Sequence, residues 1–162
     1  MGALATSGLY APTKLTSVHA FSNFDCGESS LNQWLHRRAL LNQQSGASAT
    51  YVVATTAGVV VGYYCLAAGC VALSSVPKNL KRNTPDPVPV TVLGRLAVDV
   101  NAQNKGIGRG MVRDAVLRTT QAADIIGIRA ILVHALPSAK SFYLNCGFAA
   151  SPVDPLVLML KL

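Results

Sequence analysis

The residues best suited to chemistry form a glycine-rich segment, Gln103-Asn104-Lys105-Gly106-Ile107-Gly108-Arg109-Gly110. It lies between an apolar run typical of a strand and a long stretch with helical periodicity. Glycines at such a junction let the backbone approach a ligand closely, and the first N–H groups of a helix have no intrahelical acceptor. The helix dipole, Lys105 and Arg109 add positive charge. The segment therefore predicts a binding site for an anion such as a pyrophosphate.

Two common phosphate-binding motifs do not fit this spacing. The chain contains no G-x-x-x-x-G-K-[ST] segment, and Met111 occupies the third glycine position of G-x-G-x-x-G. A glycine-rich turn that binds no ligand is the alternative that the segment alone leaves open.

The charge balance narrows the classes of partner. Fourteen Lys and Arg residues against seven Asp and Glu give a formal charge of +7, which favours a polyanion. Nucleic acid, coenzyme phosphates and an acidic protein all qualify, and a basic surface without a specific partner is the alternative. The cysteine spacing matches neither a metal site nor a disulfide framework and indicates a reduced, cytoplasmic protein without metal: Cys26, Cys65, Cys70 and Cys146.

The apolar composition predicts a packed globule rather than a membrane protein. Hydrophobic residues make up 51% of the chain, which suits one domain over residues 1–162, with residues 1–13 as a flexible tail. Residues 39–77 carry no charge, but their densest apolar part, 59–73, is shorter than the ~20 residues of a membrane-spanning helix. We therefore expect this part of the chain in a buried sheet.

The elements that position the glycine-rich segment follow from periodicity. Residues 50–56 and 59–66 are rich in Val, Thr and Tyr and are separated by Ala57-Gly58, a pattern typical of a hairpin. Elsewhere the pattern predicts strands over residues 15–20, where the alternation is weak, 91–100, 130–135 and 156–162. It predicts helices over residues 30–44, where Gly46 ends the helix, 106–126 and 138–145. This order predicts an α/β fold (an α+β mixed sheet) with helices on both faces.

Two motifs give the chain a family resemblance. Gln103-x-x-Gly106-x-Gly108 looks like the coenzyme A pyrophosphate loop of the GNAT acetyltransferases, and Ala139-x-x-Phe142-Tyr143-x-x-x-Gly147-Phe148 resembles their C-terminal signature. The similarity is closer to the acetyltransferase toxins of bacterial toxin–antitoxin pairs and extends over nearly the whole chain. Five further segments carry it: Phe24-x-Cys26-Gly27, Leu31-x-x-Trp34-Leu35, Val61-Gly62-Tyr63-Tyr64, Pro85-x-Pro87-x-Pro89-Val90 and Gly94-Arg95-Leu96-Ala97-Val98-Asp99.

The resemblance implies a fold, an acetyl donor and a substrate. The fold is a GNAT-like acyl-CoA N-acyltransferase fold, whose central mixed sheet is splayed between two parallel strands. The donor is acetyl-CoA, and the target in that family is the α-amino group of an aminoacyl-tRNA, whose acetylation blocks translation. Besides the glycine-rich segment, the residues implied in binding the donor are Leu96, Ala97, Val98, Ala135 and Phe142.

The implied reaction needs one proton donor. A free α-amino group has a pKa of about 8, and that of an esterified amino acid should be lower still, so a substantial fraction is neutral at neutral pH and a strong general base is dispensable. The departing thiolate can take a proton from a phenol, whose pKa is near 10, and Tyr143 of the motif is the candidate. A tyrosine that only packs the last helix is the alternative. His134, on the strand beside the expected cleft, is a rival acid or base.

Basic residues outside the glycine-rich segment predict contacts with tRNA phosphates. Lys78, Lys81 and Arg82 fall in a proline-rich stretch that we expect to be an exposed loop. Arg37 and Arg38 lie on the first predicted helix, and Arg95 lies on the strand that enters the cleft. Arg95 could instead pair with Asp99 or with a carboxylate of an antitoxin.

The resemblance also implies partners. These are an acidic antitoxin of the ribbon-helix-helix type, DNA only through that antitoxin, and a second copy of the toxin in a homodimer. The sequence departs from the pattern of this branch at Asn32, where Asp is expected, and we interpret Asn32 as a helix-capping residue. Two other functions stay open: an acetyltransferase acting on a small amine or a protein N-terminus, and a regulatory module that binds acyl-CoA without catalysis.

Overall fold

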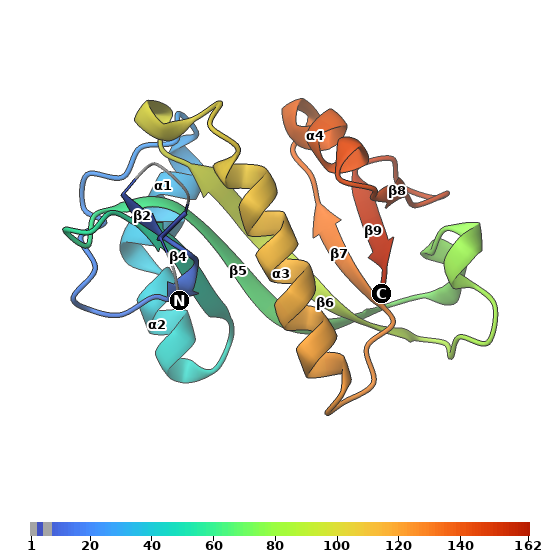
Figure 1. Ribbon diagram of the computed structural model, residues 1–162. Coiled ribbons are helices and arrows are strands. Elements are labelled where there is room, and N and C mark those ends of the chain that lie inside the picture. Colours follow the sequence, from blue (N-terminus) through green and yellow to red (C-terminus); the bar gives the residue numbers. More distant parts are fainter. Residues whose placement is uncertain (1–2, 5–7) are drawn as a thin grey trace. The chain divides into compact units, whose positions relative to one another are not determined.

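The computed structural model describes residues 3–4 and 8–162 (Figure 1). Its α-helices are α1 (Ser29–Arg37), α2 (Ala39–Ser45), α3 (Ile107–Ala123) and α4 (Lys140–Asn145). One mixed sheet has the strand order β3-β4-β5-β6-β7-β9-β8: β3 (Thr13–Lys14), β4 (Ala49–Ala54), β5 (Val60–Val71), β6 (Val88–Val98), β7 (Ala130–His134), β9 (Val157–Lys161) and β8 (Ala149–Ala150). Short 3₁₀ helices are η1 (Leu73–Ser75), η2 (Lys78–Leu80), η3 (Val100–Ala102) and η4 (Pro137–Ala139). The predicted fold class is confirmed.

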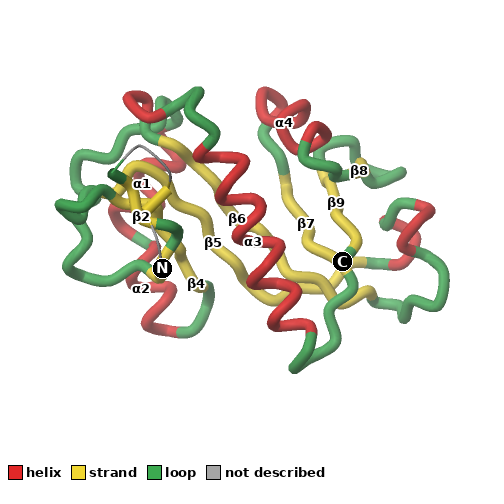
Figure 2. The backbone as a smooth tube through the Cα atoms, in the orientation of Figure 1, coloured by secondary structure: helices red, strands yellow, loops and turns green. Residues whose placement is uncertain are grey.

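The chain divides into two compact units. The first comprises Met1–Leu66 and Arg95–Asp114, and the second comprises Ala67–Gly94 and Ala115–Leu162. Strands β5 and β6 and helix α3 each contribute residues to both units (Figure 2). A single domain over the whole chain stays a prediction.

The strands of the first unit bury side chains on both faces. Neighbouring residues of a strand point to opposite faces, and accordingly Val52 and Val53 of β4, and Ala97 and Val98 of β6, belong to different core clusters. One cluster joins the strands to α1 and α2 and comprises Val52, Val60, Tyr63, Ala97, Leu35 and Ala39. The other joins the strands to α3 and comprises Val53, Val61, Leu96, Val98, Ile107 and Met111. Helices therefore cover both faces of this part of the sheet, as the sequence predicts.

Helix α3 approaches β5 closely at Gly62. A Cβ atom at this position would lie 3.2 Å from Ile107 Cγ2 and 3.2 Å from Met111 Sδ. These distances are shorter than ordinary van der Waals contact, so the absence of a side chain lets the first turns of α3 lie against the strand.

The single helix predicted over residues 30–44 is wrong, because the chain bends at Arg38. The φ and ψ angles of Arg38, −119° and −30°, separate α1 from α2 without any glycine or proline. With this bend, Leu35 and Ala39 are both buried, while Leu41, which the helical pattern placed on the apolar side, is 57% exposed. Packing against the sheet has overridden local helix propensity here.

The N-terminal part of the chain contains more strand than the sequence predicts. Strand β1 (Ala3–Leu4) pairs antiparallel with β2 (Leu9–Tyr10), and Leu9 is buried. These elements and the first residue of β3, Thr13, lie in the segment 1–13, for which we expected a tail; residues 1–2 and 5–7 are outside the described residues. The strand predicted over 15–20 is wrong, because a turn closed by the His19 N–H on the Thr16 carbonyl interrupts it.

In the second unit, β6 and β7 form the expected parallel pair. Their ladder runs from Val90↔Ala130 to Leu93↔Val133, and β6 continues to Val98 beyond the last pair. Strand β9 pairs antiparallel with the other edge of β7, which makes the sheet mixed. This is the sheet arrangement that the family resemblance implies.

The proline-rich stretch between β5 and β6 is better anchored than predicted. We expected no regular element, but η1 and η2 lie here and bury Val76 and Leu80. Their cluster includes Val88, Val90, Ala130, Leu132 and Met159. Arg129 Nη2 donates to Thr84 Oγ1 at 3.0 Å and to the Arg82 carbonyl at 3.4 Å. The loop is thus fixed by apolar side chains and by one guanidinium.

Candidate active site

The glycine-rich segment connects η3 to the first turn of α3 in the first unit. Asn104 and Gly106 adopt left-handed conformations, with φ angles of 63° and 81°, which turn the chain sharply before the helix. The first α-helical hydrogen bond runs from the Gly110 N–H to the Gly106 carbonyl at 3.0 Å. Lys105 and Arg109 are exposed. Strand, tight turn and helix start therefore occur in the order that an anion site at a helix N-terminus requires.

Polar side chains hold the turn that precedes this segment. Asp99 caps η3, because its Oδ1 accepts the Asn101 N–H at 2.9 Å. Gln103 Nε2 donates to the carbonyl oxygens of Val98 at 2.9 Å and of Cys26 at 3.1 Å. The Gln103 side chain is thus occupied in supporting the turn, and the predicted contact of Gln103 with a cofactor would fall to its main chain.

The three predicted cofactor residues of β6 divide between two faces. Leu96 and Val98 pack in the cluster of Ile107, on the face that α3 covers. Ala97 packs on the opposite face, in the cluster of Leu35. The side chain of Ala97 therefore does not share a face with the start of α3.

Tyr143 and Phe142 lie on α4 in the second unit. Tyr143 is 5% exposed, and its ring makes edge contacts with Phe142 at a centroid distance of 5.1 Å and with Phe148 at 5.5 Å. Its carbonyl accepts the N–H of Cys146 at 3.0 Å and of Phe148 at 3.1 Å, which ends the helix. The ring is therefore fixed in orientation by two aromatic neighbours.

Two further residues considered from the sequence lie at the end of β7. Ala135 is buried, and its N–H donates to the Leu156 carbonyl at 2.8 Å. His134 is exposed and lies opposite Val157 of β9. The role of His134 as an acid or base stays a prediction.

Arg95 has an aromatic partner. Its guanidinium carbon lies 4.7 Å from the centroid of the Trp34 ring, which in turn stacks on Tyr63 at 5.9 Å with an interplanar angle of 9°. Burial raises the pKa of Tyr63, whose protonated hydroxyl donates to the Leu31 carbonyl at 2.7 Å. A cation over an indole face gains electrostatic attraction, so this stack holds Arg95 in a defined orientation.

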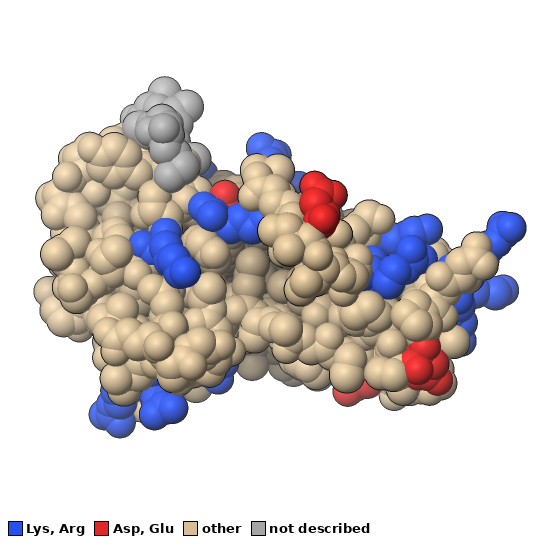
Figure 3. Space-filling model, turned by 90° about the horizontal axis from the view of Figure 1, so that it is seen from below, with Lys and Arg blue, Asp and Glu red and all other residues tan. Residues whose placement is uncertain are grey.

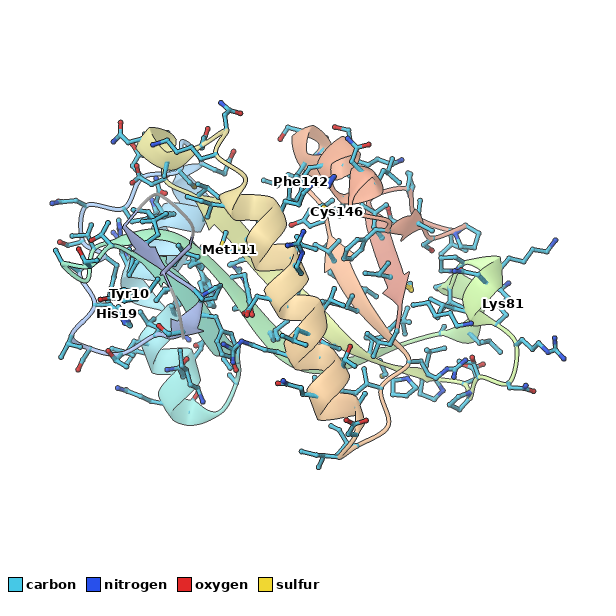
Figure 4. All side chains as sticks on the ribbon, viewed as in Figure 1. Tyr10, His19, Lys81, Met111, Phe142 and Cys146 are labelled. Atoms are coloured by element: carbon cyan, nitrogen blue, oxygen red, sulfur yellow. The ribbon has the colours of Figure 1, made fainter. Side chains whose placement is uncertain are left out.

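The other predicted tRNA residues are exposed. Arg37 and Arg38 lie at the end of α1, and Arg38 Nη2 donates to Asn42 Oδ1 at 3.2 Å. Lys78, Lys81 and Arg82 lie in and after η2, where Lys81 projects from the loop (Figure 4). Blue Lys and Arg side chains predominate over red Asp and Glu on the face shown in Figure 3.

The described residues, 3–4 and 8–162, contain no group of three or more His, Cys, Asp or Glu side chains that could hold a metal ion. None of the four cysteines forms a disulfide. Cys65 is buried, whereas Cys70 is exposed. Among these residues no helix is both long and apolar enough to cross a membrane.

Comparison with known proteins identifies the family. The model of the acetyltransferase (GNAT) domain matches residues 47–150, which include the glycine-rich segment and Tyr143. The chain belongs to the GNAT acetyltransferases. It is 48% identical over 155 residues to a tRNA-acetylating toxin of Mycobacterium tuberculosis, covering 95% of this chain and 93% of the relative.

Two solved structures of the toxin AtaT share the GNAT fold of this chain. AtaT complexed with acetyl-methionyl-tRNAfMet has a TM-score of 0.88 and 27% identity, over 94% of each chain. A mutant of AtaT bound to the C-terminus of the antitoxin AtaR and to acetyl-CoA has a TM-score of 0.81 and 27% identity, over 96% of this chain and 94% of that one. This GNAT chain is thus an acetyltransferase of the toxin type.

Sequence reasoning missed several residues that organise these regions. The Trp34 contact with Arg95 and the Arg129 contacts with the proline-rich loop join segments far apart in the chain, and no local pattern predicts them. The interpretation of Asn32 as a helix-capping residue is wrong, because its side chain contacts Cys26 and Asp25 ahead of α1, and the N-cap residue is Glu28, which makes no side-chain cap hydrogen bond. The departure of Asn32 from the expected Asp was the available signal of a specific role.

Proposed function

We propose that this GNAT acetyltransferase transfers the acetyl group of acetyl-CoA to the α-amino group of an aminoacyl-tRNA in the cytoplasm and so blocks translation. The observation that carries the proposal is the turn at Asn104 and Gly106 opening into α3, together with 48% identity to a tRNA-acetylating toxin. The turn supports binding of a diphosphate, and the relative supports the choice of acceptor.

In this proposal the main-chain N–H groups of residues 103–110 bind the coenzyme A diphosphate. The N-terminal end of α3 contributes partial positive charge, and Lys105 and Arg109 contribute full charges from exposed positions. Leu96, Val98, Ala135 and Phe142 provide apolar surface for the rest of the donor. Ala97 contributes through its main chain only, because its side chain packs on the other face.

Tyr143 is the proposed general acid. The neutral α-amino nitrogen attacks the thioester carbonyl, the carbon–sulfur bond breaks, and the coenzyme A sulfur takes the proton of the Tyr143 hydroxyl. The proton that the amine loses then returns to the phenolate through solvent, so the enzyme is unchanged. Such proton donation contributes on the order of a hundredfold in rate. The fixed ring of Tyr143 suits this role because the hydroxyl position varies little.

The basic residues are proposed to contact the tRNA. Arg95, oriented by Trp34, and the exposed groups Arg37, Arg38, Lys78, Lys81 and Arg82 are the candidates. We further propose that the protein is held inactive by an antitoxin of the ribbon-helix-helix type, which alone contacts DNA, and that the toxin forms a homodimer. The AtaT complex with AtaR supports the antitoxin.

The test is acetyl transfer from labelled acetyl-CoA to total tRNA, charged or deacylated. We expect label only in the charged pool, released with the amino acid by mild base. The Tyr143→Phe variant should lower kcat about a hundredfold and leave the Kd for coenzyme A unchanged. Equal labelling of both pools, or label in peptides and small amines but not in tRNA, contradicts the proposed substrate.

A further inference from the structure

A polar loop in the first unit is tied to the turn before the glycine-rich segment. Asp25 donates its N–H to Asp99 Oδ2 at 3.1 Å, and its carbonyl accepts the Val100 N–H at 2.8 Å. The Gln103 side chain adds its hydrogen bond to the Cys26 carbonyl at 3.1 Å. The two side-chain bonds of this set join residues that lie 74 and 77 positions apart in the sequence.

Asn32 holds this loop in shape with both ends of its amide. Its Oδ1 accepts the Cys26 N–H at 2.8 Å, and its Nδ2 donates to Asp25 Oδ1 at 2.8 Å. The same Asp25 oxygen accepts the Gly27 N–H at 2.9 Å, and Gly27 has the left-handed φ of 90° that this turn requires. An aspartate at position 32 could accept from Cys26 but could not donate to Asp25. The amide therefore performs a task that the expected Asp cannot.

Both carboxylates of this network accept from N–H groups of the loop and the turn. Backbone donation from Gly27 and the Asn32 amide keep the pKa of Asp25 below its ordinary value, so Asp25 is charged at neutral pH. Asp99 accepts at both oxygens, from Asn101 and from Asp25. The hydrogen bonds that Asp25 Oδ1 accepts from Gly27 and Asn32 are therefore charge-assisted, which makes them stronger than neutral ones.

We propose that Asp25, Cys26 and Asn32 form a clasp that sets the turn at 99–103 and thereby aims the main-chain N–H groups of 103–110. The clasp residues are positioning residues, because they act on the anion site through Asp99, Val100 and Gln103. The inference rests on the proposed function, since the ligand of those N–H groups is the coenzyme A diphosphate. Supporting residues of this kind change affinity without touching the ligand.

Calorimetric titration with coenzyme A tests the clasp without any acceptor. Asn32→Asp removes the donor and places a second carboxylate beside Asp25, so we expect about tenfold weaker binding. Adding Asp25→Asn restores a donor and acceptor pair and should return the Kd to within about threefold of the wild type. Gln33→Ala is the matched control, because Gln33 is exposed on the same helix and bonds only to Ser29 Oγ among the described contacts. Its Kd should not change.

Amide hydrogen exchange at Gly27, whose N–H donates to Asp25 Oδ1, and at Val100 gives a readout that does not depend on the ligand. Faster exchange in Asn32→Asp, with native circular dichroism, is expected. If that variant does not fold, Asn32→Ala removes both hydrogen bonds of the Asn32 amide without added charge and should weaken binding at least about threefold. An unchanged Kd despite faster exchange, or weak binding that Asp25→Asn does not rescue, overturns the clasp alone. Absence of coenzyme A binding by the wild-type protein contradicts the cofactor assignment itself.

Discussion

The turn before the glycine-rich segment and the proline-rich loop are both irregular, but they are fixed by different means. The turn is held by hydrogen bonds: the Asp99 carboxylate accepts the N–H groups of Asp25 and Asn101, and Gln103 Nε2 donates to the Cys26 carbonyl. The loop is held by the buried side chains of Val76 and Leu80. Hydrogen bonds fix the direction of main-chain N–H groups, whereas apolar anchors fix a segment's place and leave its charged side chains exposed. The hydrogen-bonded turn therefore suits a compact diphosphate, and the loop with exposed charges suits a large polyanion.

Removing an apolar anchor should have the largest effect. Leu80→Ala deletes a side chain that is 1% exposed and should lower the free energy of unfolding by about 3 kcal/mol. Urea denaturation measures this loss. Coenzyme A binding, measured below the unfolding transition, should persist, because the residues of the turn are untouched. Loss of that binding together with stability would contradict the separation of the two regions.

Strain in the glycine-rich segment should weaken coenzyme A binding, which the loss of an apolar anchor in the loop should leave intact. Gly106→Ala places a Cβ on a residue with φ of 81°, at a cost of about 1–2 kcal/mol, and should weaken coenzyme A binding about tenfold. Gly58→Ala is the control: its φ is 83°, and its Cβ would also meet no atom within 4 Å. It should lower stability by a similar amount without changing the Kd. Equal Kd values of the two variants for coenzyme A would contradict this prediction.

A single charge in the loop should have a smaller effect. Lys81→Gln should reduce the affinity for tRNA about two- to threefold and lower the slope of log K against log salt by roughly 0.7–0.9. Filter binding at several salt concentrations measures both. Lys161→Gln, which changes an exposed lysine of β9, should leave the slope unchanged. The same loss in both variants would indicate unspecific attraction.

The smallest effect should come from titrating Asp25. Because the folded pKa lies below the ordinary value of 3.8, the charged carboxyl stabilises the fold above about pH 4. That contribution is lost as the pH falls through the lower, folded value. We expect Asp25→Asn to lower the urea midpoint at pH 6 and to differ less from the wild type at pH 3. A difference in urea midpoint between the variant and the wild type that is larger at pH 3 than at pH 6 would contradict this direction of pH dependence.

The sequence predicts the parts of this molecule that depend on local pattern. The hairpin around Gly58 and the helix after Gly106 follow from periodicity and turn residues, whereas the parallel pair of β6 and β7 is implied by the family resemblance. The break at Arg38 does not, because burial of Leu35 and Ala39 against the sheet decides it.

The contacts that support the candidate site also could not be predicted from local sequence pattern. Asn32 reads as a capping residue, and its bond to Asp25 becomes visible only when the loop is folded back onto the helix. Ala97 reads as part of one cofactor-binding stretch, but the pleat of β6 turns its side chain away from those of Leu96 and Val98. Contacts between distant segments, and the alternation of faces, are set by tertiary structure.

The contact of Arg95 with Trp34 makes the tryptophan fluorescence of this protein sensitive to the position of Arg95. The sequence contains one tryptophan, so its emission comes from a single place, beside a guanidinium and the ring of Tyr63. Any ligand that draws Arg95 away changes the polarity and quenching around that indole. Fluorescence of the unlabelled protein therefore separates events at Arg95 from events at the glycine-rich segment in real time.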